Sequence, residues 1–210
     1  MESKIITALR EGIRDEEPVI ASFSSSLWSA SESPTNMGIC MYVPKADSEG
    51  FAAINCHYNR GSEYYEPYEN YCTRGLDFTG KTVGVIGHLK QVKLRHGKEA
   101  KKIYIFELDP KDEDDLPFEK EAEMLPECDI VIITGSALVN RTLEDVISWC
   151  PDAYKILAGP SVPKSKILFD FGLDRIAGMS VADTEKMREH IKNEIAGTPY
   201  VYGTPFMISK

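Results

Sequence analysis

The stretch "VGVIGHLKQV", residues 83–92, decides how the second half of this chain is interpreted. An apolar beginning without alternation is typical of a parallel strand that is covered on both faces. Gly87 then predicts a tight turn into a helix, whose first N–H groups can receive a phosphate or another polar group. The stretch contains Gly84 and Gly87 but lacks the G-x-G-x-x-G order of dinucleotide-binding proteins. The dinucleotide signal is therefore weak, and His88 stands where such a fingerprint continues with small residues.

Three further apolar runs follow the same pattern. They are "KIYIFEL" (102–108), "DIVIITG" (129–135) and "YKILAG" (154–159), and amphipathic stretches lie between them. Short apolar strands that alternate with helices predict an α/β fold with a parallel, doubly wound sheet. In the last amphipathic stretch, "DTEKMREHIKNEIAG", Asp183 is the predicted N-cap of a helix.

Residues 1–79 predict a small α+β domain and a connector, and residues 80–210 a second domain. The first domain begins with a helix whose apolar residues Ile5, Ile6 and Leu9 have helical spacing. Two strand-like runs follow, "PVIASFSSSLWSA" and "NMGICMYV", and then a helix over "SEGFAAINCHYN". The connector carries four tyrosines between residues 62 and 79, which we interpret as packing and loop anchors or, alternatively, as an aromatic ligand surface.

Composition limits the classes of partner. The 210 residues are 42% hydrophobic and 27% charged, as in a globular protein, and the net charge of −9 repels nucleic acid. No apolar run approaches the roughly 18 residues of a membrane helix, and the acidic N-terminus is unlike a signal peptide. We therefore expect a cytoplasmic protein without a nucleic-acid or membrane partner. Its oligomeric state, monomer or homo-oligomer, stays open.

No metal site is predicted from the ligand-type residues. The five cysteines are odd in number and form no C-x-x-C pair, so we expect reduced thiols. Cys56 and His57 are adjacent and point apart on any regular element. The acidic run at 112–115, "DEDD", is interpreted as a solvated loop rather than a cation site because no EF-hand spacing surrounds it.

Candidate ligand-binding residues follow the predicted strands, because open parallel sheets bind ligands at the carboxyl ends of their strands. Glu107 lies 20 residues after Gly87, where a carboxylate can accept hydrogen bonds from a ribose diol, or alternatively only ends a strand. The other candidates at these ends are Gly87, Pro110, Thr134, Gly135, Gly159, Pro160 and Ser161.

Three side chains are candidates for catalysis. His88 can act as a general acid or base because its unperturbed pKa is about 6.5, or alternatively it only caps the helix that it begins. The run "TGSALVNRT" places Ser136 and Asn140 near the same strand-to-helix junction, where they can orient a ligand. Alternatively, this run is a plain loop with a capped helix. The run "AGPSVP" forms a second polar lip at the next strand end.

Several motifs occur together in one order: "GKTVGVIGH", "IFELDP", "LPECDIVIITGSALVNRT", "AGPSVP" and "LDRIAGM". In this order they resemble the family of uncharacterised prokaryotic proteins labelled "Putative heavy-metal chelation". The resemblance covers residues 80 to about 182, and "GFAAINCHYN" resembles the end of that family's N-terminal domain. It implies a Rossmann-like domain preceded by a small domain similar to the N-terminal part of enolase, with a ligand site in the cleft between them.

The resemblance implies the same strand-end residues as site residues and adds Asn55 from the first domain. Two departures affect the first-domain half of the cleft. The chain is shortened between "MYVPK" and "GFAAIN", and Cys56-His57 replaces small or aromatic residues.

Three functions remain open from the sequence, and it decides neither whether the protein is an enzyme nor which cofactor it uses. The first is an enzyme of metal-chelator or cofactor metabolism, with a small-molecule ligand that is a metal chelate or its precursor. The second is a non-catalytic carrier of a heavy-metal complex. The third is an adenosyl-cofactor-dependent methyltransferase, which ranks last because the usual second glycine is missing.

Overall fold

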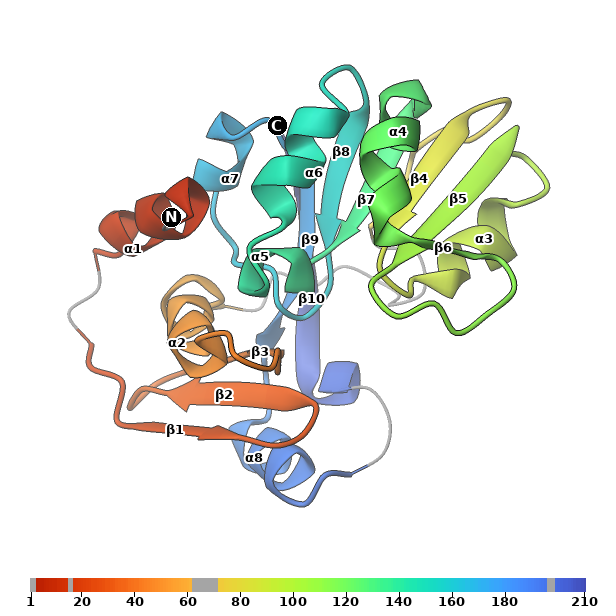
Figure 1. Cartoon of the computed structure of the whole chain (residues 1–210). Coiled ribbons are helices and arrows are strands. Elements are labelled where there is room, and N and C mark those ends of the chain that lie inside the picture. The colour runs from red at the N-terminus through yellow and green to blue at the C-terminus, as the bar shows by residue number, and fades with distance from the viewer. Residues whose placement is uncertain (1–2, 15–16, 62–71, 196–198) are drawn as a thin grey trace.

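A computed structural model describes residues 3–14, 17–61, 72–195 and 199–210 (Figure 1). Within these ranges the strands form a small antiparallel sheet and a seven-stranded sheet. The small sheet contains β1 (Ala21–Ser24), β2 (Trp28–Glu32) and β3 (Met37–Met41). The large sheet contains β4 (Thr82–Ile86), β5 (Lys102–Glu107), β6 (Asp115–Pro117), β7 (Ile130–Thr134), β8 (Tyr154–Ala158), β9 (Arg175–Val181) and β10 (Gly203–Ser209).

The order of the large sheet is β10-β9-β8-β7-β4-β5-β6. All neighbouring strands are parallel except β10, which pairs antiparallel with β9. The chain first proceeds from β4 through β5 to β6 and then returns to the other side of β4 with β7. This is the Rossmann order, and the direction of winding reverses between β4 and β7. The predicted α/β class with a mainly parallel sheet is confirmed.

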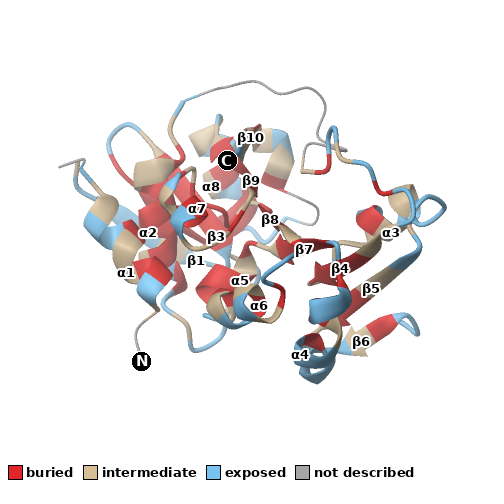
Figure 2. Cartoon of the chain, turned by 90° about the horizontal axis from the view of Figure 1, so that it is seen from above, coloured by how far each residue is buried: buried red, intermediate tan, exposed pale blue. Residues whose placement is uncertain are grey.

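The central strands carry apolar residues on both faces. Val131 and Ile133 belong to the core beneath the helices on one face, whereas Val83 and Ile132 belong to the core that contains Val92 on the other. Figure 2 shows buried residues along β4 and β7 and mostly exposed surface on the outer side of α4. Two-sided burial explains why β4 and β7 carry apolar residues at consecutive positions rather than only at alternate ones.

The helices of this half are shorter than the amphipathic runs. They are α3 (Lys90–His96), α4 (Glu121–Met124), α5 (Ser136–Val139), α6 (Leu143–Trp149), α7 (Ile167–Asp170) and α8 (Thr184–Lys192). Short 3₁₀ turns η1 (Phe118–Lys120) and η2 (Leu125–Glu127) flank α4, and η3 (Pro199–Tyr202) precedes β10. Asp183 accepts a hydrogen bond from the Lys186 N–H, so the predicted N-cap is confirmed.

The first part of the chain adds α1 (Lys4–Gly12) and α2 (Ser48–Tyr58) to the small sheet. Both helices were predicted, and Ile5, Ile6 and Leu9 are buried as expected. The first strand-like run, 18–30, is not a single strand: it turns at Ser25, whose hydroxyl accepts from the Trp28 N–H, and returns as β2. A serine-rich stretch satisfies its own backbone in such a turn. The four tyrosines at 64, 65, 68 and 71 lie outside the described residues.

The two parts of the chain share buried surface. Met187 and Ile191 of α8 pack with Ala30 and Ile39 of the small sheet. The Glu144 carboxylate accepts from the Ser3 hydroxyl at 2.6 Å and from the Ile5 N–H in the first turn of α1 at 3.0 Å. Figure 1 shows α2 and the small sheet below the carboxyl ends of β7 and β8, with α8 on the far side of that sheet. The first part of the chain is therefore positioned against one end of the large sheet.

Candidate functional site

The reversal of winding between β4 and β7 places Gly87 against Thr134. Gly87 has a φ of +90°, and a Cβ added to it would lie 2.7 Å from Thr134 Cγ2. Only glycine adopts this backbone without strain and also leaves room for the neighbouring strand end. The turn after β4 and the end of β7 are therefore in direct contact at the point where open α/β sheets bind ligands.

The ends of β7 and β8 continue this edge. The Thr134 and Ser136 hydroxyls lie 3.1 Å apart, and both residues are half-buried. The Gly135 N–H donates to Ala158 at 2.7 Å, and a Cβ added to Gly159 would lie 3.6 Å from Gly135 N. Gly87, Thr134, Gly135, Ser136 and Gly159, which were selected because they follow predicted strands, thus lie along one edge of the sheet. Whether they bind a ligand stays a prediction.

On the other side of β4, His88 faces three carboxylates. Its Nδ1 lies 3.4 Å from Glu107 Oε1 and 3.8 Å from Asp115 Oδ2, and its Nε2 lies 3.7 Å from Asp112 Oδ2. Glu107 is the last residue of β5, the neighbour of β4. The sequence predicted that His88 and Glu107 follow adjacent strands, and the structure brings them together. We call His88, Glu107, Asp112 and Asp115 the imidazole–carboxylate cluster.

Two carboxylates of this cluster are poorly solvated. The Asp115 side chain is 1% exposed and that of Glu107 is 17% exposed. Among the described residues, Asp115 Oδ1 and Glu107 Oε1 have no hydrogen-bond partner. Burial raises the pKa of Glu107; the facing His88 opposes this rise and Asp115 adds to it. The surroundings therefore do not fully solvate the negative charge of these carboxylates. Such a site favours the binding of a proton or a cation.

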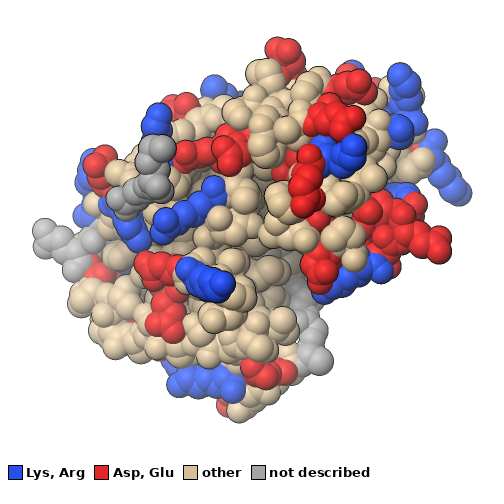
Figure 3. Space-filling view, viewed as in Figure 1, with Lys and Arg blue, Asp and Glu red and all other residues tan. Residues whose placement is uncertain are grey.

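Lysines screen the outer side of the cluster. The Lys90 ammonium contacts Asp112, and the Lys93 ammonium lies 2.5 Å from Asp114. Figure 3 shows acidic and basic side chains side by side at the edge of the molecule that carries α3, β5 and β6 in Figure 1. The acidic run was predicted to be a solvated loop. That holds for Asp112 and Asp114, which are exposed, but was wrong for Asp115, which begins β6 and is buried.

Asn55 and Ser161 lie at the junction between the two parts of the chain. Asn55 is fully buried, and its amide donates to Ile39 at 2.7 Å and to the Ser161 carbonyl at 3.1 Å. The Ser161 hydroxyl accepts from the Met41 N–H at 2.9 Å. Asn59, which sequence reasoning did not select, donates to Val162 at 2.9 Å in the same way. These groups hold β3 and α2 on the segment after β8.

The three remaining candidates lie at turns. The Asn140 side-chain oxygen accepts from the N–H and the hydroxyl of Thr142, at 3.1 and 2.8 Å, and so closes the turn after α5. Pro110 is exposed in the loop after β5, and Pro160 is half-buried after Gly159. Their part in ligand binding stays a prediction.

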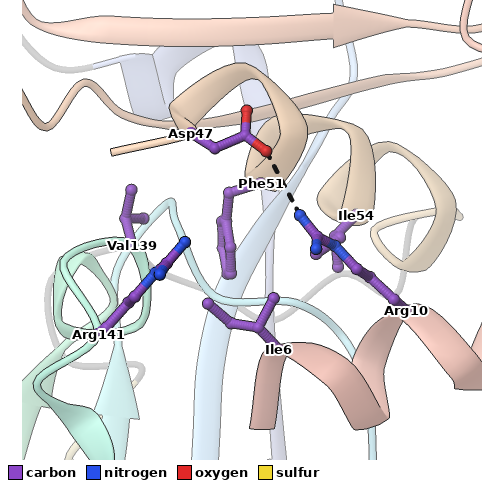
Figure 4. A pocket seen from close by; sticks show the side chains of 7 residues that line it. All are labelled: Ile6, Arg10, Asp47, Phe51, Ile54, Val139 and Arg141. Atoms are coloured by element: carbon purple, nitrogen blue, oxygen red, sulfur yellow. Dashed lines mark hydrogen bonds and ion pairs between the residues drawn. The ribbon is translucent and has the colours of Figure 1, made fainter. Parts of the chain in front are cut away.

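A small pocket lies where α1 and α2 meet the turn after α5 (Figure 4). Phe51 and Val139 contribute apolar walls, and the Arg10 guanidinium lies 3.4 Å from Asp47. The Arg141 side chain points toward Phe51 from the opposite side, and its backbone has a φ of +67°. Ile6 and Ile54 complete the lining. This pocket lies between the two parts of the chain, at a place that the predicted site residues did not indicate.

Comparisons with known proteins place the chain among uncharacterised relatives. The family model described as "Putative heavy-metal chelation" matches residues 76–203. An uncharacterised protein from Methanocaldococcus jannaschii is 34% identical over 121 residues, which are 56% of this chain and 44% of that protein. The chain therefore spans less than half the length of that curated relative.

Two crystal structures of proteins with unknown function from the same family have a similar fold. The structure from Desulfitobacterium hafniense has a TM-score of 0.87 at 24% identity and covers 99% of this chain and 97% of that one. The structure from Pyrococcus horikoshii has a TM-score of 0.81 at 21% identity and covers 99% of each chain. At these identities the likeness shows the fold alone.

Proposed function

This chain belongs to the family described as "Putative heavy-metal chelation", and from that membership we propose that it binds a polar small molecule, a metal chelate or its precursor, as an enzyme of chelator or cofactor metabolism. The observation that carries the proposal is the contact between Gly87 and Thr134 at the reversal of winding, with the imidazole of His88 on one side and the Ser136 hydroxyl on the other. Polar groups from neighbouring strands converge there, as they do in ligand sites of this architecture.

Binding and orientation are assigned to the hydroxyls and the glycine turns. Thr134 and Ser136 can each donate to and accept from a ligand oxygen or nitrogen. Thr134 and Val162 fill the space that a side chain would take at Gly87 and Gly135, so these glycines let the strand ends pack closely and bring the hydroxyls together.

Proton transfer is assigned to His88, with Glu107 as the group that orients it. A carboxylate 3.4 Å from Nδ1 favours the tautomer that leaves Nε2 to exchange a proton with a ligand. Burial raises the pKa of Glu107, because the charged carboxylate is poorly solvated there. The pair can therefore pass a proton at a strand end where a ligand is also held.

The experiment is an unbiased mass-spectrometric search for small molecules that co-purify with the protein. Calorimetric titration with each retained compound follows, for wild-type protein and for His88→Ala and Ser136→Ala. Ser148→Ala is the matched control, because Ser148 is an exposed serine of α6. We expect His88→Ala and Ser136→Ala each to weaken binding tenfold or more and the control to leave it unchanged. Unchanged affinity in both site variants contradicts the proposal.

The location between the two parts of the chain is tested in the same titration by Arg141→Ala. The pocket in Figure 4 lies between these parts and offers guanidinium groups to an anion. Loss of binding in Arg141→Ala alone would place the ligand in that pocket. Loss in Ser136→Ala alone would place it at the strand ends.

A second candidate function, a non-catalytic carrier of a heavy-metal complex, is favoured by the carboxylates of Asp112 and Asp115. A proton carrier needs one orienting carboxylate, whereas His88 faces three. A carrier releases its metal complex unaltered after denaturation, whereas an enzyme converts it. Mass spectrometry of the complex before and after incubation with the protein separates the two functions.

A further inference from the structure

We propose that His88, Asp112 and Asp115 bind a divalent first-row transition-metal cation directly, with Glu107 as a neighbouring oxygen donor. The inference rests on the site of the proposed function but not on its reaction. One ligand atom from each of the three residues lies within 4.8 Å of the other two. The protein would then hold the metal of a metal complex through its own side chains, rather than holding only the organic part.

The separations suit a coordination shell. Bonds from zinc-like cations to imidazole nitrogen and carboxylate oxygen are about 2.1 Å, so two ligand atoms of one cation lie about 3 to 4 Å apart. His88 Nε2 lies 3.7 Å from Asp112 Oδ2, whereas Asp115 Oδ2 lies 3.8 Å from the other ring nitrogen, Nδ1. Because one cation binds only one imidazole nitrogen, the His88 and Asp112 side chains have to rotate to close the shell from the present limit of 4.8 Å, and both are more than 40% exposed.

A second observation separates this cluster from an ordinary group of surface acids. The Asp115 side chain is 1% exposed, and its Oδ2 accepts from the N–H groups of Lys111 and Asp112 at 3.0 Å each. Its Oδ1 is buried and has no hydrogen-bond partner within the described ranges. A buried carboxylate with an oxygen that lacks a donor destabilises the folded chain, and a cation bound by this carboxylate lowers that cost because it neutralises the buried charge. The buried acid is thus fixed in position by the backbone and incompletely satisfied.

A cation bound at this cluster would compete with Lys90 for the Asp112 carboxylate. The Lys90 ammonium contacts Oδ2 of Asp112, whose side chain is the most exposed of the three carboxylates. A divalent cation bound to Asp112 has to displace this ammonium, because both use the same oxygen. Removal of the ammonium should therefore strengthen metal binding, whereas a cluster that serves only as a salt-bridge network predicts no such gain.

The donor atoms also indicate the class of metal. One imidazole and two or three carboxylates suit Mn²⁺, Co²⁺, Ni²⁺ or Zn²⁺ rather than thiophilic ions. Thiolates do not contribute to this cluster, which contains no cysteine. Among the described cysteines, Cys40, Cys56, Cys128 and Cys150 are buried, and burial raises the pKa values of Cys40, Cys128 and Cys150 to about 12, 12 and 11. Three protein donors also leave coordination positions for water or for the atoms of a chelator.

The test is titration of the metal-free full chain with Co²⁺ alone, followed by calorimetry and by visible absorption of the bound ion. We expect one equivalent of Co²⁺ in wild-type protein and at least tenfold weaker binding in His88→Asn, Asp112→Asn and Asp115→Asn. The Asp115→Asn side chain can still accept the two backbone hydrogen bonds. This variant therefore tests the effect of the lost charge while the loop keeps its structure. Asp109→Asn is the matched control, because Asp109 is an exposed acid of the same loop.

Lys90→Met should have the opposite effect on affinity and tighten Co²⁺ binding severalfold. Binding that is absent in wild-type protein, or equal in Asp112→Asn and Asp109→Asn, overturns the proposal. Asp112 and His88 are exposed, so their variants decide the result even where Asp115→Asn lowers stability.

Ser136→Ala separates the two inferences: Co²⁺ binding that survives in this variant while small-molecule binding is lost supports both. Loss of neither in Ser136→Ala supports the metal site and removes Ser136 from the small-molecule site, for which His88→Ala is then the deciding variant.

Discussion

Gly87 and Thr134 meet at the reversal of winding so closely that a single methyl group added to Gly87 would lie 2.7 Å from Thr134 Cγ2 and 2.9 Å from its Cβ. This contact joins the ends of β4 and β7 and brings the polar groups of both strands to one place. The backbone of Gly87, with its φ of +90°, makes the approach possible.

The first prediction is that Gly87→Ala destabilises the protein by about 2 to 3 kcal/mol, because it adds backbone strain to a steric overlap. The measurement is the free energy of unfolding in urea. Thr134→Ser removes the methyl group at 2.7 Å but keeps the Cβ at 2.9 Å, so Gly87→Ala with Thr134→Ser should recover only part of the steric cost and none of the backbone strain. No difference between wild-type protein and Gly87→Ala would show that the turn is free to rearrange.

The second prediction concerns Glu121, a buried residue of α4 whose pKa is raised by burial to about 7. A carboxyl with a raised pKa in the folded state is favourable when protonated, so its contribution to stability is lost as pH rises from about 4.5 through about 7. Glu121→Gln should therefore stabilise the protein by about 1 to 3 kcal/mol at pH 8 and by almost nothing at pH 4.

Urea unfolding of wild-type protein and Glu121→Gln between pH 4 and pH 8 measures this effect. Glu119→Gln is the matched control, since Glu119 is exposed in the preceding turn η1. A difference between wild-type protein and Glu121→Gln that does not change with pH would contradict the assignment.

The third prediction concerns the ion pair between Arg188 and Glu32. The guanidinium donates to the two carboxylate oxygens at 2.7 and 3.0 Å and joins α8 to the end of β2. A bidentate pair in which the carboxylate side is only 12% exposed should have a coupling energy of about 1 kcal/mol. A double-mutant cycle with Arg188→Met and Glu32→Gln measures it. Arg188→Lys should lose most of the coupling, because an ammonium cannot make the paired contact.

The fourth prediction separates a structural role from a ligand-binding role for Ser161. Its hydroxyl accepts from the Met41 N–H, so Ser161→Ala should leave a partly buried donor without a partner and cost about 1 to 2 kcal/mol. Asn59→Ala is the comparison: its amide serves Val162 and Met179 and should cost more, about 2 to 4 kcal/mol. Thermal unfolding and ligand titration of both variants decide between the roles. Lower stability with unchanged ligand affinity in Ser161→Ala means that Ser161 only holds the two parts together.

The strands of the large sheet were predictable because burial on both faces requires apolar residues at consecutive positions. Val85 and Ile86 in β4, and Ile132 and Ile133 in β7, are apolar at neighbouring positions, which a strand with one solvated face does not tolerate. The polar residues after β4, β5 and β7 were predictable for the same reason, since each follows directly on an apolar run. The turn at Ser25 was missed because serines fit both a strand and a turn, and only the pairing of β1 with β2 decides.

The sequence by itself determined which residues follow the strands and that neighbouring strand ends converge at one edge of the sheet. Only the tertiary structure decided which side chains share that edge. Asp115 reaches His88 because β6 adds to the sheet beside β5 with Asp115 opposite Ile105, a pairing that no local pattern specifies. Asn55 and Ser161 are directed at each other by the packing of α2 on the segment after β8. Local periodicity encodes burial, whereas the partner of a polar atom depends on which distant backbone is packed against it.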